Sequence, residues 1–210
     1  GPENKTANIE KYVQKGCHVI LTNAETLIGF EGEHEWGPPQ FPNVSWVLYN
    51  QSETSNTKLA NRVYVYFDYS GAYYLSGIAA AHEAVNCIGV ISAFETDRNP
   101  NDATNGFIRG VRSVNTTLPI HQVTMGNWYQ PIPERRAAEL LRERGCNVIV
   151  HYTDPRDIDV YVGENPTAEF PNAPADTNFF SVGSHSNLHL YVGDSVLAAV
   201  YNDWANVLVP

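Results

Sequence analysis

Residues 13–20 read Val-Gln-Lys-Gly-Cys-His-Val-Ile, and residues 142–149 repeat the pattern as Arg-Glu-Arg-Gly-Cys-Asn-Val-Ile. In each copy a charged helix end meets a glycine, Gly16 or Gly145, and a short β-branched apolar run follows. Glycine adopts the left-handed conformation that closes a helix, and such apolar runs favour buried strands. The repeat therefore predicts two similar α/β lobes facing each other across a cleft, with Cys17 and Cys146 beginning equivalent inner strands.

Strands and helices are expected to alternate along the rest of the chain, which is typical of parallel sheets flanked by helices. The expected strands are 17–22, 44–49, 63–67, 87–94, 120–125, 148–152, 179–183 and 195–201, and the expected helices are 9–15, 71–85, 107–114 and 134–144. We expect residues 1–86 to form the remainder of lobe 1, 87–182 to form lobe 2, and 183–210 to return through the hinge to lobe 1.

Composition excludes several functional classes. The 210-residue chain carries a formal charge of −10, which leaves no basic surface for nucleic acid. Its apolar runs fall short of the roughly 20 residues of a membrane helix, so we expect no direct membrane insertion of this piece. Phosphate-binding loops, dinucleotide fingerprints and nucleophile elbows do not occur in the sequence, which argues against an enzyme and predicts no cofactor.

The cysteines and histidines give no metal or redox signature. Cys17, Cys87 and Cys146 each stand at the entry to an apolar run, and we expect them to be small buried hydrophobes instead of disulfide partners. The seven histidines are scattered, so no metal site is expected. The charged run 134–144 indicates a solvated helix face with i, i+4 ion pairs.

Four sequons of the Asn-x-Ser/Thr type occur in this chain and favour a secreted or cell-surface protein bearing N-linked glycans. They begin at Asn4, Asn43, Asn50 and Asn115. The opening Gly1-Pro2 is typical of a protease scar, so the chain is expected to be an excised piece.

Ligand-binding residues are expected where strands end, because ligands of parallel α/β sheets bind beyond the carboxyl ends of the strands. The set at these points is aromatic and hydrogen-bonding, with few cations, which suits a neutral planar or polyhydroxyl ligand. Its members are Asn23, Glu25, Phe94, Glu95, Asp97, Asn127, Trp128, Tyr152, Thr153, Asp154, His185, Ser186 and Asn187.

An ordered series of motifs resembles the basic membrane protein family of solute-binding lipoproteins. The motifs are Tyr-Tyr-Leu-Ser-Gly-Ile-Ala-Ala at 73–80, Ile-Gly-Val-Ile-Ser-Ala-Phe at 88–94, Asn-Gly-Phe at 105–107, Gly-Val-Arg-Ser-Val-Asn at 110–115, Asn-Trp-Tyr at 127–129, Glu-Arg-Arg-Ala-Ala at 134–138, Val-Ile at 148–149 and Thr-Asp at 153–154. The resemblance implies a two-lobed periplasmic-binding-protein-like fold of type I, an α/β class without catalysis. In characterised members it implies binding of purine nucleosides for ABC transporters.

The resemblance implies that four residues at matching motif positions line the cleft: Asn105, Trp128, Thr153 and Asp154. Two departures stand out. An acidic hinge residue of the family is replaced by the amide of Asn187, which puts nucleoside specificity in doubt, and the family's first strand and helix pair is absent. A sheet truncated at its N-terminus exposes an unpaired edge, so we expect a homodimer or completion by another segment.

Several functions remain open from the sequence. We favour an extracellular sensor or solute-binding ectodomain of a receptor for a nucleoside-like ligand, over a bacterial transport receptor. A structural or adhesion domain that kept the fold and lost ligand binding is the alternative. A nucleoside hydrolase is less favoured, and would use Glu95 or Asp97 with His151 or His185 as an acid and base pair.

Overall fold

The computed structural model describes residues 2–22, 40–49, 60–168, 170, 173–174 and 176–202. Their contacts divide the chain into two compact units, Gly1–Phe67 and Asp68–Pro210. The expected site residues Asn23 and Glu25 and the sequon at Asn50 lie outside the described residues.

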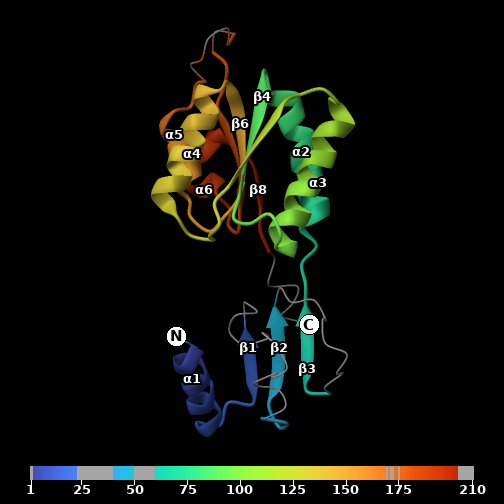
Figure 1. Ribbon diagram of the computed structural model, residues 1–210, viewed down its shortest axis with the longest axis vertical. Coiled ribbons are helices and arrows are strands. Elements are labelled where there is room, and N and C mark those ends of the chain that lie inside the picture. The colour runs from blue at the N-terminus through green and yellow to red at the C-terminus, as the bar shows by residue number, and fades with distance from the viewer. Residues whose placement is uncertain are drawn as a thin grey trace. The chain divides into compact units, whose positions relative to one another are not determined.

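The first unit is a small parallel sheet with one described helix. Its elements are α1 (Pro2–Gln14), β1 (Val19–Thr22), β2 (Ser45–Tyr49) and β3 (Arg62–Val65), and the strand order is β1-β2-β3 (Figure 1). Val44, Trp46 and Leu48 form its buried core, because alternate residues of β2 point to one face. Ile9 and Val13 of α1 pack against this core.

The repeated junction has the predicted backbone conformation in both copies. Gly16 follows α1 with φ of 88°, and Gly145 follows α4 (Pro131–Glu143) with φ of 94°. The backbone N–H of Cys17 donates to the carbonyl oxygen of Tyr12 at 3.1 Å, which satisfies an acceptor that the helix end leaves open. The glycine pattern thus correctly located both helix ends.

The expected equivalence of the two following strands is wrong. Strand β6 (Cys146–Tyr152) is buried at every residue and has a neighbour on each side, whereas β1 is an edge strand among the described residues and begins at Val19, after Cys17. Val19 is 62% exposed and Leu21 49% exposed. Local sequence predicts a strand, but the number of neighbouring strands decides whether it is an inner one.

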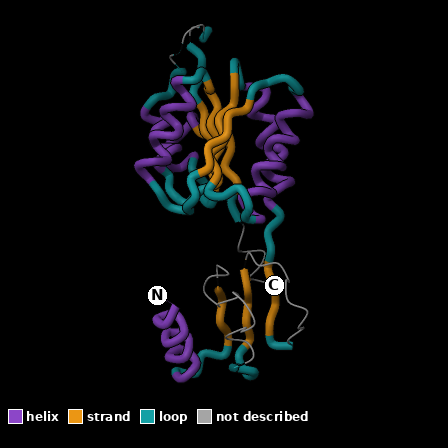
Figure 2. The backbone as a smooth tube through the Cα atoms, in the orientation of Figure 1, coloured by secondary structure: helices purple, strands orange, loops and turns teal. Residues whose placement is uncertain are grey.

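The second unit is a five-stranded parallel sheet between two helical layers. Its elements are α2 (Tyr69–Glu83), β4 (Cys87–Ser92), α3 (Arg98–Val114), β5 (Ile120–Thr124), α4, β6, α5 (Asp157–Glu164), β7 (Phe180–Ser184), α6 (His189–Val192), a 3-10 turn (Gly193–Ser195) and β8 (Val196–Val200). The strand order is β5-β4-β6-β7-β8. Helices α2 and α3 cover one face, and α4, α5 and α6 cover the other (Figures 1 and 2). The predicted α/β layering is confirmed.

Helices α2 and α3 pack with their backbones in close contact at three glycines. A Cβ atom added at Gly77 would collide with the carbonyl oxygen of Phe107, one at Gly106 with that of Ser70, and one at Gly110 with that of Tyr74. Only glycine allows this approach, because any side chain would push the two helices apart. This packing holds α2 on the sheet of the second unit.

Domain boundaries differ from the expected ranges. The structure divides the chain after Phe67, so α2 belongs with the second unit, whereas residues up to 86 were expected in the first lobe. Strand β8 pairs with β7 in the five-stranded sheet, whereas residues 183–210 were expected to rejoin lobe 1. Pairing between segments far apart in the chain decides these memberships.

Two of the three cysteines form a disulfide, so the expectation that they are unpaired hydrophobes is wrong for them. Cys87 and Cys146 are bonded across 59 residues, while Cys17 is free. They begin the neighbouring strands β4 and β6 and occupy paired positions. A register shift beside them, between Cys87 and Ile88, adds one residue to β6 and turns Cys146 toward Cys87. Strand order and this bulge, neither visible locally, bring the sulfurs together.

Candidate functional site

The carboxyl ends of β4, β5, β6 and β7 lead into a cluster of aromatic rings, the aromatic cluster, which consists of Phe94, Trp128, Tyr152 and His185. The ring centroids are 5.6 Å apart for Phe94 and Trp128, 5.9 Å for Trp128 and Tyr152, and 5.3 Å for Tyr152 and His185. All three pairs meet edge to face, which is a favoured arrangement of aromatic quadrupoles. Residues from four segments are thus held together where the sequence predicted a ligand site.

The cluster rests on a buried aromatic base. Tyr152 is 3% exposed and also contacts the rings of Tyr69 and Tyr73, at 5.3 and 5.8 Å. Phe94 and Trp128 are half-buried, so part of each ring remains accessible. A rigid, packed base with accessible rings above it suits stacking of a planar ligand.

Two polar groups belong to this region: the Asp154 carboxyl group, beside the aromatic cluster, and the ring nitrogens of His185, within it. The Asp154 backbone N–H donates to the Trp128 carbonyl oxygen at 2.9 Å, which joins two of the strand ends. Asp154 Oδ1 lies 3.7 Å from His185 Nε2. Desolvation lowers the pKa of His185 to about 4, and the nearby His151 also lowers it. This lowered pKa favours the neutral form of the His185 imidazole beside Asp154.

Desolvation raises the pKa of Asp154 above its usual value. The side chain is still 53% exposed, so its carboxyl oxygens are accessible to a ligand. His185 has a positive φ of 66°, and its backbone N–H donates to the Val200 carbonyl oxygen at 2.8 Å. The loop after β7 is thereby tied to β8, and this tie orients the His185 ring toward Tyr152.

Three other expected site residues lie apart from these contacts. Asp97 precedes α3 and is exposed, Asn187 is exposed in the loop after β7, and Asn105 is exposed on α3, where its Nδ2 donates to Asn101 Oδ1 at 2.7 Å. Within the described residues, none of the three makes a hydrogen bond or ring contact with the aromatic cluster. Their place in a ligand site stays a prediction.

Thr153 lies beneath the site and takes part in a buried polar chain. Its hydroxyl donates to Glu134 Oε2 at 2.8 Å and lies 3.2 Å from His151 Nδ1. His151 Nε2 lies 2.9 Å from Asp159 Oδ2. All four side chains are buried, with exposures of 1% or less. The Thr153 side chain thus positions the end of β6, and its hydroxyl is already engaged within the protein.

The number of available hydrogens defines the charge state of this buried chain. Thr153 has one hydroxyl hydrogen, and it goes to Glu134, so the contact between Thr153 and His151 needs a hydrogen on Nδ1. The contact with the Asp159 carboxylate needs another on Nε2. With Glu134 and Asp159 both ionised, both contacts are hydrogen bonds only when His151 is an imidazolium.

The electrostatic surroundings agree with this assignment. Burial by itself lowers the pKa of His151, but the charge and hydrogen bond of Asp159, together with the charge of Glu134, outweigh burial and raise it. Burial also raises the pKa of Glu134, against the hydrogen bonds from Gln130 and Thr153 and the charge of His151. A paired buried histidine of this kind stabilises the folded state.

Glu134 corrects the expectation that the whole charged run is solvated. It is fully buried, and its Oε1 accepts from the backbone N–H of Gln130 at 2.9 Å at the start of α4. Arg135 and Arg136 do pair with Glu139, as expected for an exposed helix face. A glutamate in the first helical turn after Pro131 was the available sign, because carboxylates there accept from unpaired helix N–H groups.

The acid and base pair expected for a hydrolase is not assembled from His151. Its ring is 1% exposed and both nitrogens face Thr153 and Asp159. Glu95 accepts from the Thr124 hydroxyl at 2.9 Å.

No helix in the described part of the chain is long and apolar enough to cross a membrane.

The sequence profile of one protein family matches residues 38–165; its description is ABC transporter substrate-binding protein PnrA-like. Among curated proteins, the metabotropic glutamate receptor-like protein C of Dictyostelium discoideum is 26% identical over 158 residues, covering 74% of this chain and 18% of that protein. A purine-binding protein of Brucella abortus is 24% identical over 197 residues, covering 94% of this chain and 51% of that protein. The chain thus spans 18% of the length of the first relative and 51% of the length of the second.

Solved structures support the fold. A transcriptional activator of the comK gene from Bacillus halodurans superposes with a TM-score of 0.72 at 18% identity, covering 99% of this chain and 66% of that one. A solute-binding protein of an ABC transporter system from Aeropyrum pernix K1 superposes with a TM-score of 0.69 at 15% identity, covering 93% of this chain and 54% of that one. The architecture is that of type I periplasmic-binding-protein-like domains, as the sequence predicted.

Proposed function

Since the chain belongs to the PnrA-like family of ABC transporter substrate-binding proteins, we propose that it binds a nucleoside-like ligand without chemical turnover. A solute-binding role follows from the family and the fold. The observation that carries the finer proposal is the aromatic cluster at the carboxyl ends of β4 to β7, with Asp154 beside it.

The chemistry of the cluster favours a ligand with a flat ring and hydroxyl or amino groups. The accessible parts of Phe94 and Trp128 offer stacking surfaces, and the Asp154 carboxylate accepts hydrogen bonds from hydroxyl or amino groups. In its neutral form, which the lowered pKa favours, His185 offers one N–H donor and one nitrogen acceptor and adds no cation that would favour anions. The purine-binding relative from Brucella abortus supports the same ligand class.

Isothermal titration calorimetry with a panel of nucleosides, free bases and sugars tests this proposal. In Trp128→Ala, affinity for a nucleoside should fall roughly 5- to 160-fold, because base stacking on an aromatic ring contributes about 1–3 kcal/mol. Tyr129→Ala is the matched control, since Tyr129 is 64% exposed and outside the aromatic cluster. No heat with any nucleoside, or equal loss in both variants, would refute nucleoside binding at this cluster.

Turnover is tested in the same samples. Release of free base from a nucleoside, followed by liquid chromatography, would identify a hydrolase instead of a binding protein. We expect the nucleoside to be recovered intact, because the His151 imidazole is enclosed between Thr153 and Asp159.

We further propose that the chain is an extracellular receptor ectodomain. The Cys87–Cys146 disulfide supports an oxidising compartment, and the receptor-like relative from Dictyostelium supports a sensory role. Asn43 is exposed and Asn115 half-exposed, as acceptors of N-linked glycans need to be. Expression with a secretory leader in a eukaryotic host, followed by endoglycosidase treatment, tests both features by the change in mass.

A structural role through self-association is the second candidate, and the first unit carries its support. Val19 and Val63, 62% and 60% exposed, lie on the outer strands β1 and β3. A hollow between α1 and β1 is lined by Ile9, Tyr12, Leu21 and neighbouring residues. We propose that a second copy of the chain covers this apolar surface. A monomer in light scattering at micromolar concentration would contradict this, and Val19→Lys should dissociate a dimer.

A further inference from the structure

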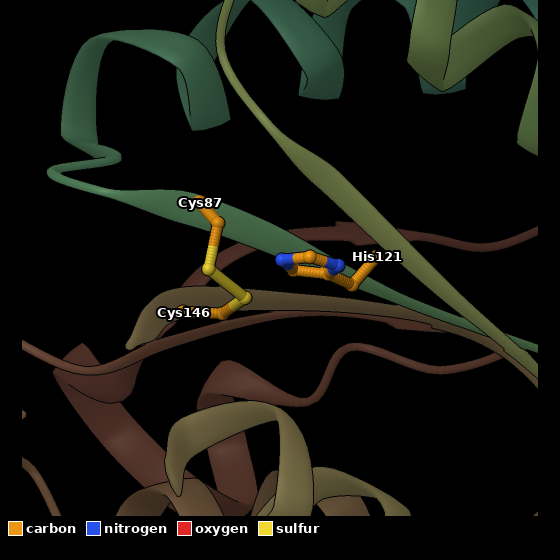
Figure 3. Close-up of side chains that lie close together, drawn as sticks. All are labelled: Cys87, His121 and Cys146. Atoms are coloured by element: carbon orange, nitrogen blue, oxygen red, sulfur yellow. A yellow bond between two sulfur atoms is a disulfide. The ribbon is translucent and has the colours of Figure 1, made fainter. Parts of the chain in front are cut away.

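We propose that Cys87, His121 and Cys146 form a binding site for a thiophilic divalent cation such as Zn²⁺, available only when the disulfide is reduced. The three side chains come from adjacent strands, β4, β5 and β6, and Figure 3 shows the His121 ring beside the two sulfur atoms. Cys87 and Cys146 begin their strands, so the site lies at the opposite end of the sheet from the aromatic cluster.

Strand register explains why the three side chains meet. Cys87 pairs with Cys146, and His121 pairs with Gly89, two residues further along β4. Paired residues of neighbouring strands share a face, as do residues two apart in one strand. The three side chains therefore share a face, and Ala138 and Leu141 of α4 in the same buried cluster identify it as the face covered by α4. The register shift next to Cys87 is what turns Cys146 to this face.

The distances suit a single metal ion. The sulfur atoms and a ring nitrogen of His121 all lie within 4.8 Å of one another. Zinc bonds of about 2.3 Å to sulfur and about 2.0 Å to nitrogen hold tetrahedral ligand atoms about 3.5 Å apart. Opening the disulfide and turning the imidazole inward would therefore need movements of less than about 2 Å.

Burial and access favour a bound cation in the reduced protein. Cys146 is 0% and Cys87 3% exposed, which disfavours free thiolates, and a dication offsets the cost of ionising them. His121 is half-buried on β5, which is an edge strand among the described residues, so it offers a route for the ion. Two thiolates and one imidazole leave a fourth position for water.

The chemistry balances with a phosphine as reductant. The phosphine takes an oxygen atom from water and becomes its oxide, and the disulfide gains the two electrons and two protons as two thiols. Binding of Zn²⁺ then releases one proton from each thiol, while the neutral imidazole bonds through a nitrogen lone pair. The same sulfurs cannot hold the metal and the disulfide at once, so oxidation empties the site.

The test uses Co²⁺ as a coloured probe and Zn²⁺ as its competitor in the Cys17→Ser background, which leaves only the two site thiols. The reduced protein should bind one Co²⁺ with a thiolate charge-transfer band in the near ultraviolet, and Zn²⁺ should remove the band. The oxidised protein should show none. Absence of the band in the reduced protein, or a reduced chain that stays unfolded by circular dichroism with metal present, would overturn the proposal.

His121→Gln distinguishes the three-ligand site from incidental binding by two thiols. This variant keeps both cysteines, so the disulfide should still form. It should weaken Co²⁺ binding at least about 10-fold, since even loss of an outer-shell partner costs about 10–100-fold. His82→Gln is the matched control, because His82 is exposed on α2, on the other side of the sheet. Equal affinity in both variants would remove His121 from the site and overturn the proposal.

Discussion

Loss of the Cys87–Cys146 disulfide is expected to lower the free energy of unfolding of the second unit by about 4 kcal/mol. The bond closes a loop of 59 residues. Chain-entropy arguments assign about 3 kcal/mol to a loop of about 15 residues and about 4.7 kcal/mol to one of about 100, and this loop lies between them. For a domain of this size each kcal/mol shifts the Tm by about 2–4 °C, so we expect a decrease of roughly 8–16 °C.

The test variant combines Cys87→Ala and Cys146→Ala. Its control is Cys17→Ser, which removes the free thiol of the first unit and should leave the free energy of unfolding unchanged. Urea unfolding that is monitored by hydrogen exchange at the amides of β4 and β6 measures the stability of the second unit alone. A difference under about 1 kcal/mol would refute the entropic reasoning. Three reactive thiols in the unreduced, denatured chain would refute the disulfide itself.

Three further predictions concern packing, charge and modification. Gly110→Ala should destabilise the second unit by about 1–3 kcal/mol in thermal unfolding, because a Cβ atom there collides with the Tyr74 carbonyl oxygen. Gly71→Ala is the control, because a Cβ atom at Gly71 meets nothing within 4 Å. Equal effects of the two substitutions would refute tight packing between α2 and α3. His151→Gln should cost more stability at about pH 6 than at about pH 9. The folded pKa of His151 is raised above 6.5, so its contribution is complete below that value and declines as pH rises through the folded pKa; a constant difference would argue against the imidazolium. Asn115→Gln should remove one glycan from the secreted protein, and an unchanged mass would show that this sequon is unused.

Local pattern was sufficient for the strands of the second unit and for helices α2 and α4, but it did not predict α5 or α6. The uninterrupted apolar run beginning at Cys87 predicted a strand covered on both faces, and every residue of β4 is buried. Helix α4 was expected at 134–144 and begins three residues earlier, at Pro131. Such features depend on side chains close together in the chain, so the sequence displays them directly.

Chain position alone predicted which side chains gather at one edge of the sheet, and their role in ligand binding stays a prediction. Phe94, Trp128, Asp154 and His185 follow the ends of strands, and parallel strands bring their ends to the same edge of the sheet. The role of Thr153 differs from that expectation, because its hydroxyl faces Glu134 inside the protein. Direction along the chain predicts which edge a residue approaches, but the neighbouring layers decide whether its side chain faces solvent or core.

The sequence by itself determined the order of the strands along the chain, the parallel layered class, the glycine-terminated helices and the edge of the sheet where the aromatic residues gather. Tertiary structure alone decided that Cys87 meets Cys146 and His121, that Glu134 is buried with His151, and that β8 joins β7. The physical reason is the range of the interactions. Periodicity and capping act over a few residues, whereas strand order, a single bulge and helix packing join residues tens of positions apart.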